Sequence, residues 1–287
     1  MTAFRELPEA GAQGRIAEIY GEIRTFYGVP YVSSLQRHLA TMPGMLEWAW
    51  EAVRPAFVSG ALPETAWRLA AEVELAPLPR LSSAALRLLG VDAETARIIR
   101  NVCLSFETVA PLNMAMGGCI RALLQEQPAG RMRESSPGES SVWRPPHVLP
   151  PPPATLALDA VSPEARAVLL QLAADMDGET FVPGLYRQLA HWPGYLAHAA
   201  TVLGPLFNDH KVTRECQRLR ERIDAATPDL LADLPEPSPL PGDTPVAHIF
   251  AAIETYQRTS PQMICFGRLL REALPGQKED ARRCFWK

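Results

Sequence analysis

The feature that most constrains the fold of this chain is an internal repeat with a constant spacing of 150 residues. Residues 29–57 align with residues 179–207 without a gap, and 11 of the 29 aligned pairs are identical. The same spacing relates further pairs near the end of each half, which are Pro111/Pro261, Gly117/Gly267 and Arg121/Arg271. A duplication of this length predicts two units of similar shape that pack about a pseudo-twofold axis, like a dimer fused into one chain.

A proline-rich segment separates the two copies of the repeat. Residues 126–161 contain eight of the 28 prolines, including four in a row at 150–153. Proline lacks a backbone N–H, so such a segment favours extended geometry over a helix. The sequence therefore predicts a first repeat at 1–125, a linker at 126–161 and a second repeat at 162–287.

The hydrophobic pattern on both sides of this linker has the period of a helix. Ile16, Ile19, Tyr20 and Ile23 follow the i, i+3, i+4, i+7 spacing, and Gly28 is placed to end that helix. Helix starts are predicted at several capping residues, some of which precede a proline: Ser82, Asp92, Ser162, Thr244 and Ser260. The sequence predicts an all-α fold of about ten to twelve helices with no strands.

Composition and charge exclude several classes of protein. The net charge of −4 gives no basic field for nucleic acid or an anionic membrane, and no uncharged run reaches the roughly 18 apolar residues of a membrane span. The N-terminus shows no signal peptide, and the five widely spaced cysteines are typical of reduced thiols in a cytoplasmic protein. The histidine and cysteine spacings match no metal motif, and there is no glycine-rich nucleotide motif, so we expect neither a metal nor a cofactor. The sequence leaves open whether the protein forms a homodimer.

The repeated motifs resemble those of the group I 2-haloacid dehalogenases, the DehI family, which acts on D- and L-2-haloacids. The resemblance is carried by RIAEIYGEIRTFYGVPYV (15–32), LATMPGMLEWAWEAVRP (39–55) and LAHWPGYL (189–196), and it covers most of residues 8–275. It implies an all-α fold of two pseudo-symmetric repeats with the active site between them. It also implies a reaction in which a carboxylate activates a water for direct attack on the halogen-bearing carbon, with inversion of configuration.

The positions to which the resemblance assigns this chemistry hold residues that cannot perform it. Leu185 stands where the family has its Asp base, and Ala110 stands where the family has an Asn that orients the water. Leu35, the repeat equivalent of Leu185, is also apolar, so neither copy supplies a base at this position. The chain is therefore either a hydrolase with a relocated base or a catalytically inactive member that binds a small organic acid or a protein partner.

We expect a ligand cavity at the seam, by which we mean the interface between the two repeats, because pockets favour such interfaces. The repeat and the resemblance together predict its lining residues, which are Tyr31, Ser34, Ala110, Asn113, Gly184, Leu185 and Tyr186. Phe106 and Trp192 keep the family pattern and are interpreted as core residues. The acidic residues that could replace the missing base are Asp177, Glu179 and Glu107.

Overall fold

The computed structural model describes residues 5–125, 142–176, 179–232, 234–242 and 246–276. Within these residues the fold is all-α apart from one short hairpin, as the helical periodicity predicted. The helices of the first half are α1 (Gly14–Tyr27), α2 (Ser34–Leu39), α3 (Met45–Val58), α4 (Ala61–Ala71), α5 (Ser83–Leu88) and α6 (Ala93–Leu124), with a 3-10 turn η1 (Glu9–Gly11) before them.

The second half begins with helix α7 and contains further helices, one hairpin and a second 3-10 turn. They are α7 (Pro163–Gln171), β1 (Ala174–Met176), β2 (Glu179–Phe181), α8 (Gly184–Leu189), α9 (Pro193–Leu203), η2 (Gly204–Asn208), α10 (His210–Ala232) and α11 (Val246–Ala273). The described residues thus contain eleven α-helices, within the predicted range. Residues 142–162, which lie between the halves, form neither helix nor strand, while 126–141 of the predicted linker fall outside the described residues.

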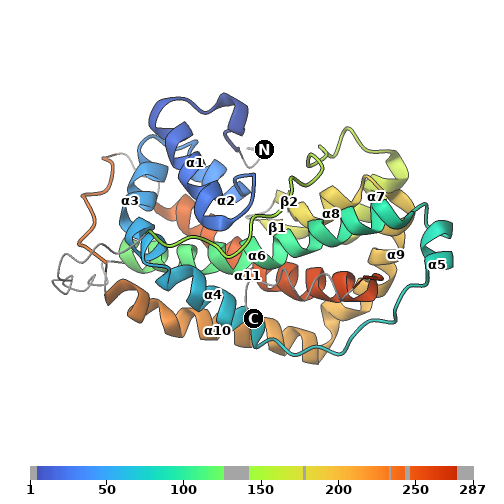
Figure 1. Cartoon of the computed structure of the whole chain (residues 1–287). Coiled ribbons are helices and arrows are strands. Elements are labelled where there is room, and N and C mark those ends of the chain that lie inside the picture. The colour runs from blue at the N-terminus through green and yellow to red at the C-terminus, as the bar shows by residue number, and fades with distance from the viewer. Residues whose placement is uncertain (1–4, 126–141, 177–178, 233, 243–245, 277–287) are drawn as a thin grey trace.

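Two long helices, α6 and α11, run through the middle of the molecule and pack against each other (Figure 1). Figure 1 shows α1, α2 and α3 grouped at one end of this pair and α7, α8 and α9 at the other, with α10 along one side. The packing is reciprocal across the seam, because α2 of the first half contacts α11 and α8 of the second half contacts α6. This arrangement places α2, α6, α8 and α11 around the same central region.

The helix bounds repeat with the spacing found in the sequence. Helix α2 at 34–39 and helix α8 at 184–189 are 150 residues apart at both ends, and α6 and α11 overlap closely at the same spacing. These bounds fit a duplication. Superposition of the halves about a near-twofold axis, and the domain limits at 125 and 162, stay predictions.

The expectation of no strands was wrong at one place. Strands β1 and β2 pair antiparallel, with Ala174 opposite Phe181 and Met176 opposite Glu179. The sequence between them is Asp-Gly, a dipeptide typical of tight hairpin turns. Three-residue strands are too short to produce a readable alternation of apolar and polar residues, so only this dipeptide could have indicated them.

Most helix starts predicted from capping residues are confirmed. The side chains of Ser82, Asp92 and Ser162 each accept a hydrogen bond from a backbone N–H in the first turn of α5, α6 and α7. The start predicted at Ser260 was wrong, because Pro261 lies inside α11. A proline there costs the helix a backbone hydrogen bond, and the extensive burial of α11 against α6 offsets this cost. Thr244 lies outside the described residues.

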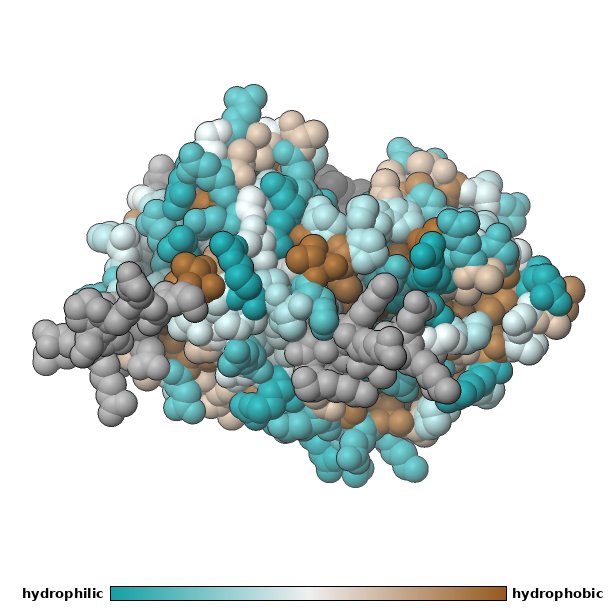
Figure 2. All heavy atoms as spheres, in the orientation of Figure 1, coloured by the Kyte–Doolittle hydropathy of each residue, from teal (hydrophilic) through white to brown (hydrophobic). Residues whose placement is uncertain are grey.

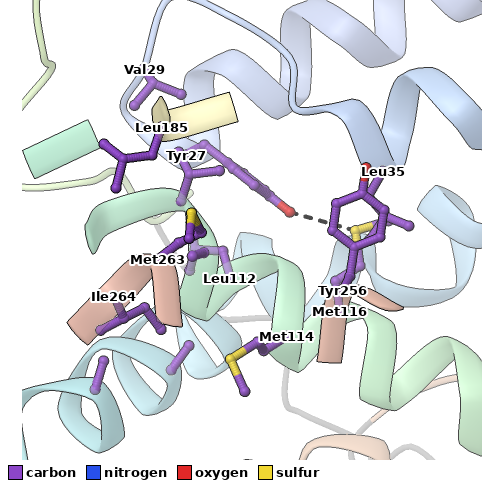
Figure 3. Packing of buried hydrophobic residues seen from close by; sticks show 14 of the residues in the cluster. Tyr27, Val29, Leu35, Leu112, Met114, Met116, Leu185, Tyr256, Met263 and Ile264 are labelled. Atoms are coloured by element: carbon purple, nitrogen blue, oxygen red, sulfur yellow. Dashed lines mark hydrogen bonds between the residues drawn. The ribbon is translucent and has the colours of Figure 1, made fainter. Parts of the chain in front are cut away.

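A single apolar core extends across both halves. Leu35 and Leu185 are both fully buried in it, and Figure 3 shows Leu185 among the side chains of this core together with Val29 and Met263. On the face shown in Figure 2, hydrophobic residues form only small separate groups among hydrophilic ones.

Three features of the described residues concern membrane spans, metal sites and cysteines. None of the helices described is long and apolar enough to cross a membrane. No group of three or more histidine, cysteine or acidic side chains is placed to hold a metal ion in this part of the chain. The cysteines at 103, 119, 216 and 265 are free thiols, and Cys284 lies outside the described residues.

Candidate functional site

A cavity of about 490 Å³ lies at the seam, between α2 and α6 of the first half and α8 and α11 of the second. Residues 151–155 of the irregular segment between the halves form part of its wall, and Figure 1 shows this segment crossing α6. The volume falls within the roughly 300–1,000 Å³ of typical small-molecule sites. The cavity therefore has the place and the size expected for a ligand site.

Five of the seven predicted lining residues belong to this cavity: Tyr31, Ser34, Ala110, Asn113 and Gly184. Leu185 and Tyr186 do not, contrary to expectation, because both side chains are fully buried in the core. The periodicity of α8 explains this result. Gly184, Arg187 and Gln188 are three and four residues apart and face the cavity, so the positions between them face inward.

Two arginines that the sequence analysis did not assign to the site also line the cavity. Arg37 on α2 and Arg187 on α8 are equivalent in the repeat. Arg37 forms an ion pair with Glu6 at 2.5 Å, whereas Arg187 donates from Nε to the backbone oxygen of Leu156 at 2.9 Å. Among the described residues, no carboxylate forms an ion pair with Arg187. The identical charged residue at the same position of both copies of the repeat was the signal that could have found them.

Burial lowers the pKa of the Arg187 guanidinium from its usual value, because the protein removes part of its water. An arginine side chain nevertheless keeps its proton in a folded protein. Arg187 therefore brings a positive charge and several N–H donors to the cavity wall, and these are the groups that recognise a carboxylate.

The walls of the cavity differ in polarity although their residues lie 150 positions apart, at the spacing of the sequence repeat. On one wall the Ser34 hydroxyl forms a hydrogen bond with the Tyr256 hydroxyl. On the other wall Gly184 packs so closely on Phe106 that an added Cβ would lie 3.1 Å from the ring. Position by position, the two central helices contribute Tyr256, Thr259 and Ser260 from α11 and their repeat equivalents Phe106, Val109 and Ala110 from α6.

Phe106, interpreted from sequence as a core residue, is only half-buried and lines the cavity. Trp192, interpreted in the same way, is half-buried and packs against the core.

Asn113 lies at one edge of the cavity in a buried polar network. Its Oδ1 accepts a hydrogen bond from Gln36 Nε2 at 2.9 Å, and its Nδ2 donates to Ser33 Oγ at 3.0 Å. Gln36 also donates to the Tyr27 hydroxyl at 2.9 Å, and Figure 3 shows the hydrogen bond from that hydroxyl to Met116. These contacts hold α1, α2 and α6 together, so the amide of Asn113 serves the packing of the first half.

Of the acidic residues considered as a relocated base, only Glu107 has a described side chain, and its carboxylate does not lie on the cavity wall. Glu107 is fully buried in an ion pair with Arg271, at 2.6 and 3.0 Å, and is absent from the lining. Strand β2 contains the backbone of Glu179, whose side chain lies outside the described residues, as does Asp177.

The carboxylates found in the described lining are those of Glu6 and Glu9. Each is held in an ion pair, Glu6 with Arg37 at 2.5 Å and Glu9 with Arg24 at 2.6 Å. Glu9 also accepts a hydrogen bond from the backbone N–H of Val32 at 2.8 Å. Both carboxylates are therefore held in ion pairs with arginines of the first half, and the charge of Glu6 also acts on Arg187, whose pKa it raises against the effect of burial.

Comparison with known proteins gives relatives of one kind. The chain is 27% identical over 196 residues to a configuration-inverting 2-haloacid dehalogenase of Alcaligenes xylosoxydans xylosoxydans, a match that covers 67% of this chain and 66% of that protein. It is 24% identical over 250 residues to an (R)-2-haloacid dehalogenase of Rhizobium sp. (strain NHG3), covering 85% of this chain and 93% of that protein. No protein-family profile matches the chain.

Solved structures show the same fold. A D-2-haloacid dehalogenase mutant in complex with D-2-CPA has a TM-score of 0.75 with 18% sequence identity, and the match covers 94% of this chain and 96% of that one. A D-2-haloacid dehalogenase with L-LA has a TM-score of 0.71 over the same shares. In sequence the chain is thus similar to 2-haloacid dehalogenases, the kind of protein that its repeated motifs resemble, and in fold it is similar to their solved structures.

Proposed function

We propose that this chain is a cytoplasmic member of the DehI family that binds a small organic acid in the seam cavity without hydrolysing a carbon–halogen bond. The observation that carries the proposal concerns the described residues of the lining: Arg187 has no ion-paired carboxylate, whereas Glu6 and Glu9 are each held in an ion pair with another arginine. Among the described residues, the site offers an arginine that can hold an anion and no unpaired carboxylate to activate water.

The chemistry of hydrolysis explains why the missing base matters. A general base must lie within about 2.6–3.2 Å of the water from which it takes a proton. Leu185 at the family's base position is buried in the core, and Ala110 at the amide position presents only a methyl group to the cavity. Glu6 would have to leave Arg37, and Glu9 would have to leave both Arg24 and Val32, before either could act on a water.

The first prediction concerns turnover. We expect no measurable halide release from either enantiomer of 2-chloropropionate, because no described residue of the cavity can serve as the base. The measurement is a halide assay at neutral pH, with the Rhizobium relative on the (R)-enantiomer as the positive control. Release at a rate near about 10 s⁻¹, the median for enzymes, would show that a base is present and would overturn the non-hydrolytic part of the proposal.

The second prediction concerns binding. Arg187→Gln should weaken the binding of 2-chloropropionate, measured by calorimetry, by about 10- to 100-fold, because a charge-assisted contact to the carboxylate is lost. Arg166→Gln is the matched control, since Arg166 also donates from Nε to a backbone oxygen of the segment between the halves, that of Leu158 at 2.7 Å, but does not line the cavity. Equal affinities for both variants and the wild type would remove Arg187 from the site.

A further inference from the structure

The seam cavity has a polar wall and an apolar wall, and these constrain the kind of ligand more closely than the charge of Arg187 does. Position for position, the repeat sets Ser34 and Tyr256 on one wall against Gly184 and Phe106 on the other. A ligand that fills the space between them therefore meets hydroxyl groups on one side and an aromatic ring with small apolar groups on the other. Such a cavity orients a ligand that has two unlike faces.

The hydroxyl wall lies close to the arginines. Tyr256, Arg37 and Arg187 line the same cavity. Burial is the main cause of a strongly raised pKa of the Tyr256 phenol; the hydrogen bond with Ser34 and the charges of both arginines lower this pKa, and the charge of Glu6 raises it. Phe181 packs edge-on against Tyr256, with the ring centroids 6.2 Å apart, and fixes its position. A carboxylate bound at Arg187 would therefore bring its neighbouring carbons within reach of the Tyr256–Ser34 pair.

Gln188, next to Arg187 on α8, supplies an unpaired polar atom. The residue is only 4% exposed and lines the cavity, and its Oε1 atom is buried with no hydrogen-bond partner, while its Nε2 donates to the Thr155 hydroxyl at 3.4 Å. Buried polar atoms of native proteins are normally paired. If the amide were turned over, its N–H group would be the unpaired one, so in either orientation Gln188 has a buried polar group for which the described residues supply no partner.

From these three observations we infer that the cavity binds a hydroxylated carboxylic acid of more than three carbons. This inference rests on the proposed binding of a small organic acid. The carboxylate binds Arg187, and the hydroxyl lies between Gln188 and the Tyr256–Ser34 pair. A hydroxyl both donates and accepts, so it satisfies the Gln188 amide in either orientation. The alkyl chain lies on the wall formed by Phe106, Val109 and Ala110.

The size of the cavity sets the length of the acid. About 490 Å³ corresponds to about 16 water molecules at roughly 30 Å³ each, which is far more space than a three-carbon acid fills. A chain of about six carbons fits within this volume and is long enough to extend from Arg187 toward the apolar wall. Since Arg187 and Gln188 are neighbours in sequence on one helix face, the hydroxyl belongs near the carboxylate end of the chain.

The test compares two acids that differ by one hydroxyl. We expect 3-hydroxyhexanoate to bind the wild type at least about tenfold more tightly than hexanoate, measured by calorimetry, because only the first pairs with the buried polar groups. Equal binding of the two acids would overturn this inference and leave the proposed function intact. If neither acid binds and 2-chloropropionate also does not, the proposed function fails with it.

Two variants locate the preference. Ser34→Gly with Tyr256→Phe converts the hydroxyl wall into its repeat equivalent, and Gln188→Met removes the amide at nearly constant volume. In each variant we expect the preference for the hydroxylated acid to fall below about threefold while hexanoate affinity stays within about threefold of wild type. Thr201→Ala, which removes an exposed hydroxyl of α9, is the control. A preference that survives in both cavity variants would show that the hydroxyl binds elsewhere.

Discussion

Glu107→Gln is expected to lower the free energy of unfolding by about 3–5 kcal/mol, the usual result of breaking a buried ion pair by removing one partner. Glu107 on α6 has no exposed surface and holds Arg271 on α11 through two short hydrogen bonds, with Arg268 3.7 Å away. Gln has nearly the same shape as Glu, so packing is retained. The cost arises because the Arg271 guanidinium stays buried with a neutral partner in place of its nearest carboxylate, and the Glu272 carboxylate 3.7 Å away is only a weaker substitute.

Thermal and urea denaturation measure this effect, and a fall of at least about 6 °C in Tm is expected for a chain of this size. Glu18→Gln is the control, because Glu18 pairs with Arg15 on the surface, where such pairs contribute less than about 1 kcal/mol. A double variant, Glu107→Leu with Arg271→Met, should recover most of the stability by replacing both charges with apolar groups. If the single variant unfolds like the control, this ion pair does not hold α6 to α11.

The sequence predicted the fold well because the fold depends on repeats, helical periodicity and capping residues, which can be recognised in a single sequence. A repeat at constant spacing indicated two equivalent halves, and the helix bounds at 34–39 and 184–189 agree with it. Cap residues such as Ser82 and Asp92 act locally, so their effect could be read from neighbouring residues. The start predicted at Ser260 failed because tertiary burial of α11 outweighs the local preference of Pro261.

The site was harder to predict because it depends on which way each side chain points. The general position of the cavity followed from the repeat, and Tyr31, Ser34 and Asn113 do line it. Leu185 was placed in the wall from an ungapped alignment, which gives the position along α8 but not the direction of the side chain. Glu107, considered as a base, is three residues from Ala110 in α6 but is committed to Arg271 on another helix. Such partners between distant segments leave no mark in a single sequence.

Leu185→Asp is expected to destabilise the fold by about 2–4 kcal/mol at neutral pH, because it places a carboxylate in the apolar core. Burial should raise the pKa of the new carboxyl above the roughly 3.9 of an unfolded Asp. The folded state then holds a proton that the unfolded state has released, so stability falls as pH rises through this window and the cost is smallest below about pH 4. Melting curves at pH 4 and pH 7 measure both effects, and at pH 7 a loss of at least about 4 °C in Tm is expected.

Leu88→Asp is the matched control, since Leu88 is 90% exposed on α5. If Leu185→Asp melts within about 2 °C of wild type at pH 7, the side chain reaches solvent and the base position of the family could be restored in this chain by one substitution.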